Sequence, residues 1–133
     1  MTITRVDHIA IVVEDLEAAL GTYRDALGLT LDHVAEIPEQ GVKAAFLPAG
    51  DGEIELLEPL SPESGIGKYL AKRGEGLHHI CLEVDDIEMT LADLKARGAA
   101  LIDETPKQGA HGRIAFIHPK GAHGVLIELV ERA

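Results

Sequence analysis

Two histidines and two glutamates recur at matching places in this 133-residue sequence. His8 opens the run His-Ile-Ala-Ile-Val-Val-Glu-Asp-Leu, and His79 opens the similar run His-Ile-Cys-Leu-Glu-Val-Asp-Asp-Ile. Glu55 and Glu128 each lie in an Ile-Glu-Leu segment further along. Neutral imidazoles and carboxylates are ligands that divalent transition metals accept, with positions left for water or substrate oxygens. The four side chains are therefore candidate ligands of one metal ion.

Each of these residues has a simpler interpretation when it is taken alone. A histidine at the start of a strand is more often a core or edge residue than a ligand, and a glutamate in a strand is more often exposed. A carboxylate among apolar residues is costly to bury without a cation, however. The recurrence of both types in both halves favours the metal site.

The repeat divides the chain into two modules, about residues 3–60 and 76–131, with a connector helix at about 64–73. Each module reads as a strand, a helix and three further strands, which gives a single domain of class α+β. The helices are expected from Asp15 to Leu27 and from Asp86 to Arg97, each ended by a glycine. The strands are expected at about 8–13, 29–37, 42–48, 53–58, 77–84, 99–103, 112–117 and 124–131.

Alternation along the first strand of each module gives the direction of the histidines. The apolar residues of that strand must face the helix: Ile9, Ile11 and Val13 in one module, Ile80, Leu82 and Val84 in the other. His8 therefore points to the opposite face, and the same phase selects His79 rather than His78 as its partner.

The composition excludes several classes of protein. A net charge of −11 with 3% aromatic residues and no Trp argues against a nucleic-acid binder. The single Cys81 excludes an internal disulfide. No apolar run approaches the ~20 residues that span a bilayer, and the start lacks a basic and apolar leader. A soluble, cytoplasmic protein is expected.

This paired arrangement resembles the vicinal oxygen chelate superfamily, and most closely the methylmalonyl-CoA epimerases. The resemblance covers nearly the whole chain and is carried by these segments: Asp7-His8-Ile9, Pro38-Glu39-Gln40-Gly41-Val42, Lys68-Tyr69-Leu70-Ala71-Lys72, Gly76-Leu77-His78-His79-Ile80, His118-Pro119-Lys120 and Gly124-Val125-Leu126-Ile127-Glu128-Leu129. It implies a curved eight-stranded sheet assembly around a central metal cup. It also implies a homodimer and a CoA thioester as the substrate.

The resemblance implies that His8, Glu55, His79 and Glu128 hold one divalent metal ion, cobalt first, with nickel, manganese, zinc or iron as alternatives. The implied reaction moves the proton on carbon 2 of methylmalonyl-CoA through a metal-stabilised enolate. Several family members carry a glutamate as one of two bases where this chain has Ala44. We therefore predict Glu128 as one acid/base and Glu55 as the second, ahead of Lys43, which strand alternation turns to the other face.

Two alternatives stay open at the level of sequence. A glyoxalase would use the same four ligand positions on a glutathione thiohemiacetal, and a non-catalytic member of the fold would only bind a small ligand. An anionic CoA substrate also needs local positive charge, because the net charge is negative. The candidates, which are otherwise solvated surface charges, are Lys68, Lys72, Arg73, Arg113 and Lys120.

Overall fold

Alternating apolar residues place each first strand against a helix, as the sequence predicts. In the computed structural model, which describes residues 2–133, these strands are β1 (Ile3–Val12) and β5 (Gly76–Val84). Ile11 and Val13 pack in one core with the first helix, whereas Ala10 belongs to a cluster on the other face. Leu82 and Val84 pack in a separate core with the third helix. The predicted phase is therefore confirmed.

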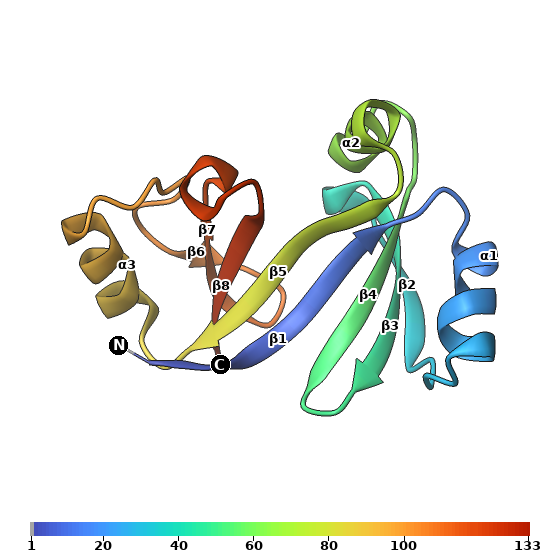
Figure 1. Cartoon of the computed structure of the whole chain (residues 1–133), viewed down its shortest axis with the longest axis horizontal. Helices are drawn as coiled ribbons and strands as arrows, with labels where there is room; N and C mark the ends of the chain where they lie inside the picture. Colours follow the sequence, from blue (N-terminus) through green and yellow to red (C-terminus); the bar gives the residue numbers. More distant parts are fainter. Residues whose placement is uncertain (1) are drawn as a thin grey trace. The chain divides into compact units, whose positions relative to one another are not determined.

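Eight strands form one mixed sheet with three α-helices, which confirms the predicted α+β class (Figure 1). The strand order is β2-β3-β4-β1-β5-β8-β7-β6, and β8 runs parallel to β5. The pairs β2–β3, β3–β4, β6–β7 and β7–β8 are antiparallel. The other elements are α1 (Leu16–Leu20), β2 (His33–Ile37), β3 (Val42–Ala49), β4 (Gly52–Pro59), α2 (Gly65–Arg73), α3 (Ile87–Ala96), β6 (Lys107–Gln108), β7 (Gly112–Ile117) and β8 (Leu126–Arg132).

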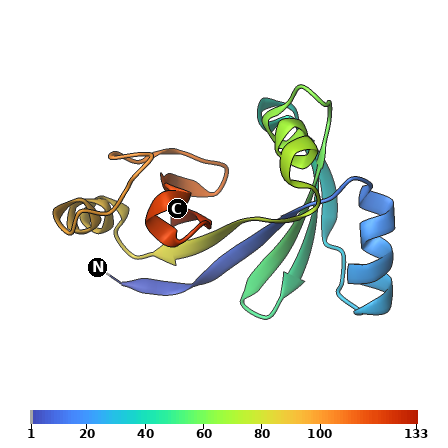
Figure 2. The same cartoon turned by 45° about the horizontal axis from the view of Figure 1, so that its top comes forward.

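The chain forms two compact units. One contains the chain up to His8 together with His79–Ala133, and the other contains Ile9–His78. In the second unit, α1 packs on β3 and β4, which Figure 2 shows from a second direction. In the first unit, α3 packs on β7 and β8. The two modules of the sequence repeat, about residues 3–60 and 76–131, are defined by sequence similarity alone, and their limits stay a prediction.

Side-chain caps fix where the helices begin. Asp15 accepts a hydrogen bond from the Ala18 amide at the start of α1, and Asp86 accepts one from the Met89 amide at the start of α3. Such a cap satisfies one of the amides that a helix start leaves without a partner. Gly98 follows α3 with a φ of 80°, a conformation that glycine adopts without steric cost. Both module helices thus begin where the sequence predicts them, and α2 lies where the connector helix is expected.

The first helix differs from the prediction in its last turns. After α1 the chain widens into a π-helical segment, Gly21–Ala26, in which the Leu27 amide donates to the Thr22 carbonyl five residues earlier. The wider turn rotates later residues away from the core. The helical spacing of Leu16, Ala19, Leu20, Tyr23 and Leu27 predicts one apolar stripe that faces the core. Leu27 is instead 65% exposed. Leu29 packs on the core in its place.

Two predicted strands are shorter than expected. Strand 29–37 begins only at His33. The segment 99–103 forms a single bridge between Leu101 and Ile117, because the Asp103 carboxylate takes the Phe116 amide that a longer ladder would use. The strand at this edge is β6, which has two residues. Within residues 2–133, none of the helices is long and apolar enough to cross a membrane.

Candidate metal centre

Three of the four predicted ligands converge within the first unit. His8 lies on β1, His79 on β5 and Glu128 on β8. The Nε2 atoms of the two histidines are 3.1 Å apart. Oε1 of Glu128 lies 3.1 Å from Nε2 of His79 and 3.3 Å from Nε2 of His8. Each side chain is 12% exposed, so the cluster is largely withdrawn from water.

These separations fit a metal site. Two ligand atoms that each lie about 2.1 Å from one ion are about 3.0–3.4 Å apart at the angles of octahedral and tetrahedral coordination. The three observed distances fall in this range. Two imidazole nitrogens and a carboxylate oxygen also form the mixed set that suits divalent transition metals. The residues present therefore fit the implied ion.

Glu128 is ionised throughout the physiological pH range. Burial would raise the pKa of Glu128, but hydrogen bonds from His79, and from His8 in its imidazolium form, which donates from both ring nitrogens, outweigh that effect and lower the pKa to about 2. A deprotonated carboxylate is the form that binds a metal. Glu128 is thus ready to act as a ligand without first releasing a proton.

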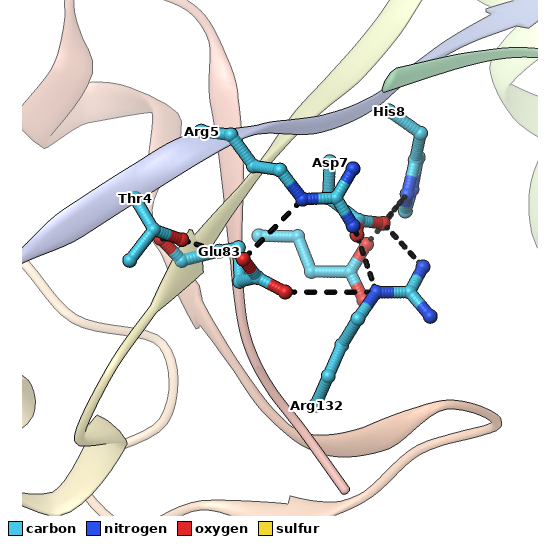
Figure 3. A network of polar contacts seen from close by, with 7 residues as sticks. Thr4, Arg5, Asp7, His8, Glu83 and Arg132 are labelled. Carbon is cyan, nitrogen blue, oxygen red and sulfur yellow. Dashed lines mark hydrogen bonds and ion pairs between the residues drawn. The ribbon is translucent and has the colours of Figure 1, made fainter. Parts of the chain in front are cut away.

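A network behind His8 was not predicted from the sequence (Figure 3). Oδ2 of Asp7 lies 2.8 Å from Nδ1 of His8, and Arg132 and Arg5 both bind the same carboxylate. Burial would raise the pKa of Asp7, but hydrogen bonds from Arg132 and His8 hold it below its usual value. Asp7 directly precedes His8, and that adjacency is the signal by which it could have been found.

Glu55 lies on β4, in the other unit. It is half-buried, and its register partner on β3 is Phe46. Ala44 is buried and clusters with Phe46 and Leu57. Because this residue is an alanine, the position supplies no acid/base group. Lys43 is the register partner of Glu58 on β4 and of Glu36 on β2, and the direction of its side chain stays a prediction. The participation of Glu55 in the metal site is part of the proposal below.

Each glutamate faces a phenylalanine on the neighbouring strand, a pairing that sequence reasoning missed. Phe46 lies opposite Glu55, and Phe116 lies opposite Glu128. His33 stacks on the Phe46 ring with 4.5 Å between the ring centroids. In the sequence, each phenylalanine lies on the strand that precedes the strand of its glutamate. Only the register of the two strands shows that the two residues lie opposite each other.

One candidate for CoA recognition already has acidic partners. Arg113 binds Glu131 at 2.8 Å and Glu88 at 3.4 Å, so its charge is compensated within its own unit. Arg73 lies over the Tyr69 ring, 5.5 Å from its centroid. A role for the other candidates, Lys68, Lys72 and Lys120, stays a prediction.

The low pKa of Glu128 predicts an acid-dependent loss of stability in the metal-free protein. A carboxyl group with a lowered pKa in the folded state stabilises the fold above its unfolded pKa, and this contribution is lost as the pH falls. For Glu128 that window runs from about pH 4.5 down to about pH 2. Urea unfolding of wild type and Glu128→Gln should therefore show a difference that shrinks through this window. A difference independent of pH would contradict the assignment.

Comparison with known proteins places this chain in a family. Residues 7–116 match the Glyoxalase/Bleomycin resistance protein/Dioxygenase superfamily. The human mitochondrial methylmalonyl-CoA epimerase is 42% identical over 127 residues, which cover 94% of this chain and 72% of that protein. The ethylmalonyl-CoA/methylmalonyl-CoA epimerase of Cereibacter sphaeroides is 43% identical over 130 residues, which cover 96% of this chain and 97% of that protein.

A solved structure gives the same result. A variant of the Streptomyces coelicolor methylmalonyl-CoA epimerase, in complex with 2-nitronate-propionyl-CoA, superposes with a TM-score of 0.85 at 41% identity. The match covers 99% of this chain and 96% of that one. The chain therefore belongs to the glyoxalase/bleomycin resistance protein/dioxygenase superfamily and, within it, to the methylmalonyl-CoA epimerases.

Proposed function

We propose that this chain interconverts the (R) and (S) epimers of methylmalonyl-CoA with one divalent metal ion as its cofactor. The observation that carries the proposal is the convergence of His8, His79 and Glu128 in a chain whose relatives are epimerases of this substrate. The ligand set does not distinguish between the metals. The resemblance favours cobalt, and nickel, manganese, zinc and iron are the alternatives.

The proposed ligands are His8, Glu55, His79 and Glu128. A divalent ion held by these residues would supply Lewis-acid stabilisation of the negative charge that develops when carbon 2 loses its proton. The two imidazoles supply neutral ligands, and the two carboxylates offset the charge of a divalent cation. Support for Glu55 comes from the repeat, since it occupies the place in β4 that Glu128 occupies in β8.

Epimerisation removes the carbon-2 proton on one face of the substrate and returns a proton on the other. Two acid/base groups are needed, and we assign Glu128 and Glu55, one from each module. In the metal-free protein, a pKa of about 2 means that Glu128 is already deprotonated but binds a proton only weakly. That pKa reflects hydrogen bonds from His8 and His79, which these imidazoles do not donate while their Nε2 atoms hold a cation.

Recognition of the CoA group and the quaternary structure belong to the same proposal. Lys68, Lys72 and Lys120 would supply positive charge for the anionic CoA group.

The active form would be a homodimer in the cytoplasm. Analytical ultracentrifugation at micromolar concentration would show the dimer directly, and a monomeric active enzyme would contradict it.

The substrate class predicts a specific exchange reaction. The metal-loaded protein should exchange the carbon-2 hydrogen of methylmalonyl-CoA in deuterated water, which proton NMR follows as loss of the carbon-2 signal. It should not convert the adduct of methylglyoxal and glutathione. The reverse pattern would make the protein a glyoxalase. Metal binding without turnover of either substrate would make it a ligand-binding member of the fold.

Strand phase predicts which histidine binds the metal. His79→Ala should remove the ion, whereas the neighbouring His78→Ala should largely retain it. Plasma mass spectrometry of the purified variants measures metal per chain. Equal loss in the two variants would contradict the phase argument on which the ligand set depends.

The two-base assignment predicts that Glu55→Gln separates metal binding from catalysis. Glutamine keeps an oxygen for the ion but removes the group that titrates. We expect retained metal and a loss in exchange rate of roughly 100-fold or more, the scale of general acid/base catalysis. Glu36→Gln, on the exposed side of β2, is the matched control and should exchange at the wild-type rate. Wild-type exchange by metal-loaded Glu55→Gln would overturn the assignment.

A further inference from the structure

The two metal-binding histidines differ in the residue that precedes them. Asp7 precedes His8, whereas His78 occupies the corresponding place before His79. The Asp7 carboxylate contacts the Nδ1 atom of His8 at 2.8 Å. The His78 ring instead packs edge-on against Tyr69, with 4.7 Å between the ring centroids. The modules that repeat the ligands therefore do not repeat their surroundings.

Asp7 is held firmly in place. Its side chain is 4% exposed. Arg132 donates a hydrogen bond to each of its oxygens, with Nε 2.6 Å from Oδ1 and a terminal nitrogen 3.1 Å from Oδ2. Arg5 donates a further hydrogen bond to Oδ1 at 3.0 Å. Glu83 binds Arg5 at 3.3 Å and lies 3.9 Å from Nε of Arg132, as Figure 3 shows. Two guanidinium groups thus hold the Asp7 carboxylate in place.

This arrangement determines which nitrogen of His8 carries the hydrogen. A carboxylate has only acceptor oxygens, so the contact at 2.8 Å requires that Nδ1 of His8 donates. A neutral imidazole with its hydrogen on Nδ1 has its lone pair on Nε2. That atom is the one that lies beside Nε2 of His79 and Oε1 of Glu128.

We propose that Asp7 is a positioning residue that fixes His8 as the Nδ1–H tautomer and aims its Nε2 atom at the metal, and that Arg132 at the end of β8 holds Asp7 for this task. The inference rests on the proposed function only in taking the ion to be the cofactor. A carboxylate behind a ligating histidine also raises the basicity of that ligand. Loss of such a partner typically costs 10- to 100-fold in metal affinity.

Metal affinity measured by chelator competition tests the proposal without reference to activity. Asp7→Asn should weaken Co²⁺ binding by roughly 10- to 100-fold, and Arg132→Gln should weaken it less, because Arg5 still contacts Asp7. Asp93→Asn is the matched control, because it also removes a carboxylate that binds an arginine, Arg97 at 3.0 Å, but on α3 and outside this network. It should bind Co²⁺ as wild type does. Wild-type affinity in both Asp7→Asn and Arg132→Gln would overturn the proposal.

The tautomer is measured separately by nitrogen-15 NMR of the metal-free, histidine-labelled protein, with His8→Gln used to assign the signals. The proposal predicts that His8 is protonated on Nδ1 in wild type and that Arg132→Gln reduces this preference. Protonation on Nε2 in the wild type would refute it, even if Asp7→Asn fails to fold. A wild-type protein that holds the Nδ1–H tautomer but shows no carbon-2 exchange would contradict the proposed function and leave this inference standing.

Discussion

A β-strand offers two faces, and in each half of this chain a helix occupies one of them. Ile11 near the end of β1 and Val13 just beyond it, and Leu82 and Val84 at the end of β5, pack against that helix. Polar residues able to do chemistry can therefore lie only on the opposite face. Because both halves obey the same constraint, His8 and His79 have the same phase. The duplicated pattern thus produces a shared site from residues that are far apart in the sequence.

Such a site buries charged side chains, and Glu128 and Asp7 each have hydrogen-bonding or oppositely charged partners within their own unit. Glu128 lies between two imidazoles, and Asp7 lies between two guanidinium groups. Across residues 2–133, no buried side-chain nitrogen or oxygen lacks a hydrogen-bond partner. His8 joins the two charged groups because one ring nitrogen faces each of them. Its orientation therefore couples the proposed metal ligands to the network behind them.

Features that depend on local periodicity could be predicted from the sequence, including the helix starts with their caps and the position of His79 beside His8. Features that depend on the register of distant strands could not. Arg132 meets Asp7 although 125 positions separate them, and no local pattern marks that pair. The exposure of Leu27 follows from a π-helical turn whose hydrogen bonding the apolar stripe does not reveal.

The central claim is that one ion is held by groups from both modules. The most direct measurement is a crystal structure of the cobalt-loaded protein with an anomalous difference map collected at the cobalt edge. We predict one peak within bonding distance of Nε2 of His8, Nε2 of His79 and a carboxylate oxygen each of Glu128 and Glu55. A cobalt peak away from these atoms, or one bound without any residue of the first module, would contradict the account.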